Sequence, residues 1–254
     1  MITGDFHTHG SFSHGKGSAM ENAREAVKKG LKSLAITEHG LFIIAGGLHA
    51  KEIKEARQEF DEAQKAFPQL KMYFGVEADL ISPEGEIDLP KEFENVFDVV
   101  LVGMHYFVKG TKQRNVIKIV WRNLFRKFIR DREKLKEINT RALVNAMHRY
   151  RIDALSHLGT SMPDFDLERI AKAAEDTDTC IELNNKHCSL SLEQLVFLAK
   201  TNVKFLLSSD AHHPEKVGQV EQMLSLALEA GIDEKNILNL NQEYIPKRLR
   251  EGMA

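Results

Sequence analysis

Residues 99–105, Val99-Val100-Leu101-Val102-Gly103-Met104-His105, form a short apolar run that ends in a histidine. Similar runs recur along the chain and predict strands at residues 4–7, 33–37, 72–77, 97–104, 154–157, 180–183 and 204–208. Between them, apolar residues recur at spacings of three and four, which predicts helices at residues 21–29, 50–66, 115–149, 167–174, 192–200 and 220–230. A strand followed by a helix, many times over, favours a parallel sheet that is either closed into a barrel or open.

The length of 254 residues suits one barrel-sized domain or two small domains. A hydrophobic fraction of 43% is too high for a disordered chain. The net charge of −2 argues against binding of polyanions by bulk electrostatics. Because no repeat, low-complexity tract or Gly/Ser linker interrupts the pattern, we expect one domain over residues 1–254.

No apolar run approaches the roughly 18 residues of a membrane span, so no membrane partner is expected. The N-terminus lacks the basic start and apolar stretch of a signal peptide. The two cysteines, Cys180 and Cys188, make neither a disulfide framework nor a zinc ribbon, and Cys180 is expected to be a small buried residue. These observations predict a cytoplasmic protein.

Residues that can bind metal ions stand at the ends of most predicted strands. His7 and His9 end the first predicted strand, and His14 follows in the next loop. Five of the later predicted strands end in His39, Glu77, His105, His157 and the pair Asp210 and His212, in that order. The carboxyl ends of parallel strands share one rim, which is where active sites form in such folds. We therefore expect these nine side chains to converge.

Their chemistry predicts a metal centre. Alternate residues of a strand face the same way, so His7 and His9 can hold one ion together. Imidazole and carboxylate groups suit zinc, manganese or iron, and the absence of a nearby thiolate argues against a structural zinc site. Nine ligands exceed the roughly four to six positions of one ion, so two to three divalent ions are expected. Glu77 could bridge two of them, and clustered ions lower the pKa of a bridging water toward about 7.

The motifs, in order, resemble those of the PHP (polymerase and histidinol phosphatase) family of metal-dependent phosphoesterases. The resemblance spans roughly residues 1–215 and rests on His7-x-His9, His14, Thr37-Glu38-His39, Gly75-Val76-Glu77, Gly103-Met104-His105, Ser156-His157 and Ser209-Asp210-Ala211-His212. It implies a distorted (β/α)7 barrel, similar to a TIM barrel, with a trinuclear metal cluster. By the same resemblance, the first ion is held by His7, His9, Glu77 and Asp210, the second by Glu77, His105 and His157, and the third by His14, His39 and His212. The chain departs from the family at Glu38, where many members carry aspartate.

We therefore expect a hydrolase acting on phosphoric ester bonds, with a small molecule or a nucleotide as the anionic substrate. A metal-activated hydroxide would attack phosphorus, with Glu77, Asp210 and His212 as the catalytic residues. Arg114, Arg122 and His213 are the candidates for substrate binding, and His212 or His213 for protonating the leaving group.

Four alternatives stay open. Two are a histidinol-phosphate phosphatase and a nuclease-type phosphodiesterase, the latter favoured by basic residues of the chain. An amidohydrolase-type enzyme would usually have a bridging lysine, which has no evident counterpart here. A non-catalytic module stabilised by metal would need fewer ligands than nine.

The composition changes at residues 109–132. The segment holds nine basic residues against one acid, Asp131: Lys109, Lys112, Arg114, Lys118, Arg122, Arg126, Lys127, Arg130 and Arg132. One interpretation is a surface helix whose apolar stripe through Trp121, Leu124 and Phe128 anchors it on the barrel or on a neighbouring subunit. The other is a cationic wall that attracts an anionic substrate. Nucleic acid is a less favoured partner, and a homo-oligomer stays open.

Overall fold

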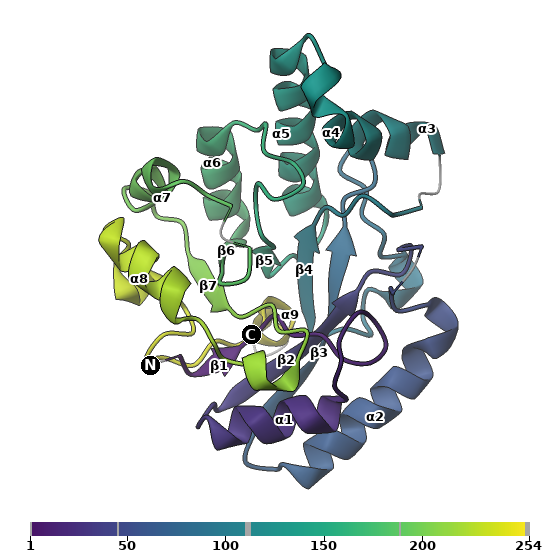
Figure 1. The fold of residues 1–254 in the computed structure, drawn as a ribbon, viewed down its shortest axis with the longest axis vertical. Coiled ribbons are helices and arrows are strands. Elements are labelled where there is room, and N and C mark those ends of the chain that lie inside the picture. Colours follow the sequence, from purple (N-terminus) through teal and green to yellow (C-terminus); the bar gives the residue numbers. More distant parts are fainter. Residues whose placement is uncertain (1, 45, 110–112, 188, 252–254) are drawn as a thin grey trace.

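The computed structural model describes residues 2–44, 46–109, 113–187 and 189–251, without the side chains of residues 113, 114 and 251. Its centre is a sheet of seven parallel strands, which lie side by side in the order of the chain (Figure 1). They are β1 (Gly4–Asp5), β2 (Ser33–His39), β3 (Lys71–Asp79), β4 (Val99–Gly103), β5 (Ala154–Leu155), β6 (Cys180–Asn184) and β7 (Phe205–Ser208). Just beyond β1 and β7, Thr8 and Ala211 form a parallel bridge, so the sheet is a nearly closed barrel. The predicted α/β barrel is confirmed.

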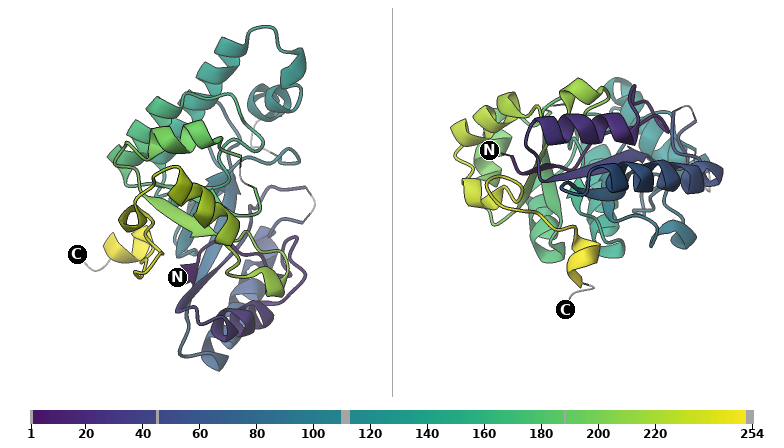
Figure 2. Two further views of the ribbon diagram at one scale, coloured as in Figure 1. Left: turned by 60° about the vertical axis from the view of Figure 1, so that its left-hand side comes forward. Right: turned by 90° about the horizontal axis from the view of Figure 1, so that it is seen from below.

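Helices surround this sheet (Figures 1 and 2). The longer ones are α1 (Ala19–Lys28), α2 (Ile53–Ala66), α5 (Arg132–Arg149), α6 (Leu167–Thr177), α7 (Leu192–Leu198) and α8 (Glu221–Glu229). Short helical turns are η1 (Ala50–Glu52), η2 (Lys91–Phe93), η5 (Pro214–Lys216), η6 (Glu234–Asn236) and α9 (Lys247–Glu251). Helices on the outside and side chains within bury both faces of the strands, which explains their nearly continuous apolar sequences.

The inside of the barrel is packed and not open. Side chains alternate along β4, so that Leu101 belongs to the inner cluster while Val100 and Val102 pack under the helices. Phe6, Tyr73, Cys180 and Tyr244 are among the other members of the inner cluster. Cys180 is buried, as predicted, whereas Cys188 lies outside the described residues.

The predicted helix at residues 115–149 is wrong in its first half. The chain instead forms four short pieces before α5: α3 (Gln113–Val116), the π-helical turn η3 (Ile117–Trp121), α4 (Arg122–Leu124) and η4 (Arg126–Phe128). Their inner face consists of Val116, Ile119, Val120 and Asn123. Trp121, Leu124 and Phe128 are predicted to anchor the segment on the barrel or on a neighbouring subunit. All three are exposed and do not pack on the barrel, because the π-helical turn holds an extra residue and shifts the face that these side chains occupy.

None of the described helices is both long and apolar enough to cross a membrane.

Candidate metal centre

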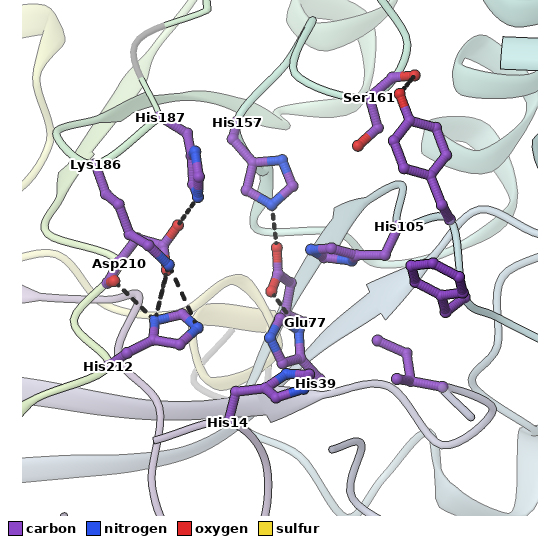
Figure 3. Close-up of a pocket in the computed structure, with 13 residues that line it drawn as sticks. His14, His39, Glu77, His105, His157, Ser161, Lys186, His187, Asp210 and His212 are labelled. Atoms are coloured by element: carbon purple, nitrogen blue, oxygen red, sulfur yellow. Dashed lines mark hydrogen bonds and ion pairs between the residues drawn. The ribbon is translucent and has the colours of Figure 1, made fainter. Parts of the chain in front are cut away.

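The predicted ligands converge at the carboxyl ends of the strands. Seven of the nine line one cavity of about 390 Å³: His14, His39, Glu77, His105, His157, Asp210 and His212 (Figure 3). The other two, His7 and His9, are buried and touch Glu77 and Asp210 of this cavity. All but His14 lie near the end of a strand or follow one within four residues, so the parallel topology brings them to one rim; His14 lies in the loop between β1 and α1.

Glu77 lies at the middle of the cluster. Its Oε2 atom is 3.0 Å from Nδ1 of His39, 3.3 Å from Nε2 of His7 and 3.7 Å from Nε2 of His9. Its Oε1 atom is 2.6 Å from Nε2 of His157. One fully buried carboxylate therefore contacts four imidazoles that follow or end three different strands.

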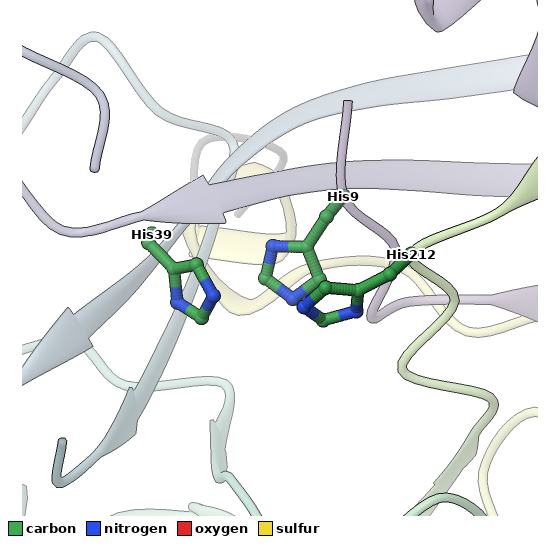
Figure 4. A group of neighbouring side chains, drawn as sticks. All are labelled: His9, His39 and His212. Carbon is green, nitrogen blue, oxygen red and sulfur yellow. The ribbon is translucent and has the colours of Figure 1, made fainter. Parts of the chain in front are cut away.

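Asp210, two residues after β7, contacts both His9 and His212. Its Oδ1 atom lies 3.5 Å from Nε2 of His9 and 3.2 Å from Nδ1 of His212. Nitrogen and oxygen atoms within 4.8 Å of one another form three overlapping groups of three residues: His7, His9 and Asp210; His39, Glu77 and His105; and His9, His39 and His212 (Figure 4). His14 stands at the edge, with its ring centroid 5.2 Å from that of His39.

These residues fit metal ions, because several buried polar atoms of the cluster have no hydrogen-bond partner among the described residues. Oε2 of Glu77 and Nδ1 of His39 are both of this kind, although they lie 3.0 Å apart. The Nε2 atoms of His7 and His9 lie 3.0 Å apart, so at least one must carry a proton for a hydrogen bond to join them. Burying such groups without partners is costly, and a cation bound among them would satisfy their lone pairs. The nitrogen and oxygen donors suit zinc, manganese or iron.

The electrostatics of the cluster favour a cation as well. Burial alone would raise the pKa of Glu77, but His7, His105 and His157 outweigh it and hold that pKa well below its usual range. Asp210 behaves in the same way, mainly because of His7. Burial and the neighbouring His39 lower the pKa of His9, so that this imidazole stays neutral. The carboxylates in turn outweigh burial and raise the pKa of His7 well above its usual range and that of His105 to about 10, so positive charge is favoured at both positions. A bound cation would supply that charge and release the protons of these imidazoles, since metal ions bind the neutral imidazole and the ionised carboxylate.

Two carboxylates that orient the imidazoles were missed in the sequence. Glu182 of β6 accepts a hydrogen bond from Nδ1 of His7 at 2.6 Å, and Asp79 of β3 accepts one from Nδ1 of His105 at 2.9 Å. Each bond occupies Nδ1 and leaves the Nε2 atom of the histidine to bind a metal ion, an arrangement common around metal sites; Nε2 of His7 lies 3.3 Å from Oε2 of Glu77. Asp79 could have been found, because it lies two residues after Glu77 on the same strand face.

Glu182 also holds a backbone turn in place. Its Oε2 atom accepts a hydrogen bond from the backbone N–H of His157 at 2.6 Å. His157 and Asp210 have φ angles of 29° and 53°, in the left-handed region that residues other than glycine seldom adopt. Backbone strain of this kind concentrates at functional sites, where the surrounding contacts maintain it.

Glu38, the departure from the family pattern, supports the loop that carries His9 and His14. The buried carboxylate accepts hydrogen bonds from the backbone N–H of Gly10 at 3.0 Å and from the hydroxyl of Ser13. Burial raises the pKa of Glu38 to about 7.

The substrate-binding candidates do not gather in the cavity. Arg122 and His213 are absent from the described residues that line it, and Nδ1 of His213 lies 3.8 Å from Oε1 of Glu215. The side chain of Arg114 lies outside the part of the chain that the structure describes. Among the described residues that line the cavity there is one lysine, Lys186, which no motif in the sequence marks; its Nζ atom is 3.3 Å from Oδ1 of Asp210 and 3.0 Å from Nδ1 of His212.

Comparison with known proteins gives a consistent picture. The family model described as "PHP domain" matches residues 5–205. A probable phosphatase of Thermoanaerobacter sp. is 29% identical over 97% of this chain and 94% of its own length. A probable phosphatase of Aliivibrio fischeri is also 29% identical, over 92% of this chain and 88% of its own length. The DNA polymerase/3'-5' exonuclease PolX of Bacillus subtilis is 27% identical over 94% of this chain, which spans only 39% of that protein.

Among solved structures, the fold is similar to that of the histidinol phosphate phosphatase of Lactococcus lactis, whose crystals contain zinc, L-histidinol and phosphate. The TM-score is 0.63 and the identity 17%, with 91% of this chain and 95% of that chain covered. At this identity the likeness shows a shared barrel fold.

Proposed function

Because the match over residues 5–205 shows that this chain belongs to the PHP family, as its motifs indicated, we propose that it is a phosphatase that hydrolyses phosphate esters of small molecules at a centre of two or three metal ions. Full-length similarity to probable phosphatases supports hydrolysis of phosphoester bonds. The observation that carries the multinuclear centre is Glu77, whose buried carboxylate contacts four imidazoles and keeps an oxygen without a hydrogen-bond partner among the described residues.

The proposed ligand sets follow the family pattern. Glu77, both imidazoles of the His7-x-His9 motif and Asp210 would hold the first ion. The Nε2 atoms of His7 and His9 lie 3.0 Å apart, 3.3 and 3.7 Å from Oε2 of Glu77, and 3.9 and 3.5 Å from Oδ1 of Asp210. Oε1 of Glu77 with His157 and His105 would hold the second. His39, His212 and His14 would hold the third.

When bound, such ions lower the pKa of a water toward about 7 and offset the charge of phosphoryl oxygens. Glu77 and Asp210 stay ionised and fix the ions, while Glu182 and Asp79 hold His7 and His105 in the orientation that binding needs. The oxygen of water forms the new bond to phosphorus as the bond to the alcohol oxygen breaks, so inorganic phosphate and an alcohol leave.

Lys186 is proposed to bind the phosphoryl group. Its ammonium lies within the cavity lining and beside two proposed ligands, Asp210 and His212. An ammonium in that place can donate hydrogen bonds to a phosphoryl oxygen, and such charge-assisted bonds are the stronger kind.

The first experiment is a phosphatase screen on protein whose metal content has been measured. Zinc-, manganese- and iron-loaded samples would be tested with nucleotides, sugar phosphates, histidinol phosphate and short oligonucleotides. We expect metal-dependent release of inorganic phosphate from small monoesters. Cleavage of oligonucleotides alone would favour the nuclease-type diesterase, for which the PolX relative is an argument. No hydrolysis by any loaded sample would contradict the proposal.

Glu77→Gln should reduce kcat about 100-fold or more, because it removes the charge shared by two ions, and a bound metal contributes several kcal/mol to catalysis. His14→Ala should have the smaller effect, since His14 is exposed at the edge of the cluster. The two variants are compared at matched metal loading. Equal kcat values would contradict the central place of Glu77.

Lys186→Met should lower kcat/KM about 10- to 100-fold, the worth of one or two charge-assisted hydrogen bonds. Its metal content should stay unchanged, and Lys186→Arg should restore part of the activity because the charge is kept. Loss of metal from Lys186→Met would instead mean that the lysine serves the centre and not the substrate.

A further inference from the structure

The segment at residues 117–128 presents large apolar side chains to solvent. Ile117, Trp121, Leu124, Phe125 and Phe128 are between 40% and 81% exposed, and they are five of the ten large hydrophobic residues exposed in the described part of the chain. Single exposed apolar residues are ordinary, but a group of them within twelve positions marks an interaction site. The catalytic proposal does not use these residues.

Basic residues are interleaved with them. Lys118, Arg122, Arg126, Lys127 and Arg130 alternate with the apolar positions, and no acid occurs between residues 113 and 130. Arg126 lies 3.6 Å from the carboxylate of Asp164, so the other four supply most of the positive charge. These residues give this end of the molecule a local positive field, although the chain as a whole carries a net charge of −2. We call the exposed apolar and basic side chains of residues 117–130 the basic–aromatic surface.

The basic–aromatic surface is held in place by its inner face. Val116, Ile119 and Val120 are buried in the core, and the amides of Asn123 and Asn139 exchange two hydrogen bonds, at 2.8 and 2.9 Å. Because the inner face is already packed, the outer apolar side chains have no place in the barrel to fill.

Contacts between side chains of the basic–aromatic surface also indicate that its shape is fixed. The rings of Trp121 and Phe125 stack with centroids 5.7 Å apart. α3 and α4 stand at the end of the molecule away from α1 and α2 (Figure 1; Figure 2, left). The surface is therefore preformed and free of contact with those helices.

We infer that the basic–aromatic surface docks on an anionic lipid bilayer. Basic residues that alternate with tryptophan, phenylalanine and leucine on a helical surface are typical of segments that lie in the membrane interface. The apolar side chains would enter the boundary between headgroups and acyl chains, while the long basic side chains reach the headgroup phosphates. This inference departs from the expectation of no membrane partner, which rested on the absence of a spanning segment; contact at the surface needs no such segment.

Other occupants fit the surface less well. A second copy would set the positive charges of Lys118, Arg122, Lys127 and Arg130 against the same four, with no acid between residues 113 and 130 to pair with them. A nucleic acid would pair with the basic residues and could stack on the rings, but the aliphatic Ile117 and Leu124 would gain nothing from phosphates. An anionic bilayer satisfies the aliphatic, aromatic and basic side chains together.

The experiment uses the only tryptophan of the chain, Trp121, as a probe at the centre of the surface. The whole protein is mixed with vesicles of phosphatidylcholine, with and without phosphatidylglycerol. We expect co-sedimentation, a blue shift of fluorescence and protection from an aqueous quencher with the anionic vesicles only. Binding should weaken about fivefold for each basic residue removed, as in Lys118→Gln and Lys127→Gln, and should decrease with added salt.

Matched controls separate docking from misfolding. Phe128→Ser should lose most of the binding, whereas Phe197→Ser, at an exposed phenylalanine of α7, should keep it. Lys65→Gln, on α2, is the charge control. Absence of binding to anionic vesicles would overturn the inference, as would equal binding by Phe128→Ser. It would also be overturned by a fluorescence change that follows protein concentration or added oligonucleotide but not lipid, which would assign the surface to a second copy or to nucleic acid.

Discussion

At the scale of single residues, the centre depends on carboxylates that would be costly to bury anywhere else. Glu77 and Glu182 are buried and ionised, and each is stabilised by several imidazoles or backbone N–H groups. Removing one partner of such a group leaves a buried charge unpaired. The roles of the two residues differ, since Glu77 faces the cavity and Glu182 lies behind His7 and His157.

Glu182→Gln should lower the metal affinity about 10- to 100-fold, the usual effect of losing the group that orients a ligating histidine. The amide is nearly the same size as the carboxylate, but it carries no charge and one of its two ends is a donor, so it cannot accept from both Nδ1 of His7 and the backbone N–H of His157. The measurement is a competition titration with a chelator. Glu229→Gln, at an exposed position of α8, is the matched control, and equal affinities for the two variants would contradict the role of Glu182.

At the scale of elements, a glycine at the end of β4 leaves room for a proposed metal ligand that follows β5. A Cβ atom on Gly103, the last residue of β4, would lie 2.4 Å from Oγ of Ser156 and 2.9 Å from Cε1 of His157. No real Cβ contact is that short, so the space above Gly103 belongs to the His157 imidazole. The end of β4 thus fixes a ligand that follows the next strand.

Gly103→Ala should destabilise the fold by about 1–3 kcal/mol, as overpacking of a filled site does. Urea unfolding of the metal-free protein measures the change. Adding Ser156→Ala removes the nearer of the two clashing atoms, so the double variant should recover part of the loss. If Gly103→Ala is as stable as the parent chain, the close approach at β4 is not a constraint.

At the scale of the whole molecule, the nearly closed barrel turns residues distant in sequence into neighbours. Asp210 meets His7 and His9 because the bridge between Thr8 and Ala211 joins the two ends of the sheet. An ion held across that junction binds the folded chain and not the unfolded one, so metal binding should stabilise the entire fold.

Removing metal with a chelator should therefore lower Tm. At an ion concentration one hundred times Kd, each site contributes about 2.7 kcal/mol, which is about 5–10 °C for a chain of this size. Thermal unfolding followed with and without zinc or manganese measures the shift, and adding the metal again should reverse it. A Tm that does not change with metal would mean that the cluster binds no ion tightly.

The strands and the rim that carries the ligands could be predicted from the sequence, because each depends on a few consecutive residues. An apolar run such as residues 99–104 marks a strand buried on both sides, and a histidine or carboxylate at its end marks the rim. The seven predicted strands agree with the structure to within a few residues, and all nine predicted ligands lie at one end of the barrel.

Only the tertiary structure decided the contacts between residues far apart in the chain. Glu182 has no local signal, since its importance lies in meeting His7, 175 positions away. No sequence pattern distinguishes Lys186 from the other lysines, since its role depends on β6 and β7 placing it beside Asp210. The outward side of Trp121 depends on a π-helical turn and on a core already filled by Val120, which spacing does not record. Periodicity fixes the face on which a side chain lies within its own element, whereas closure of the barrel determines what that face meets.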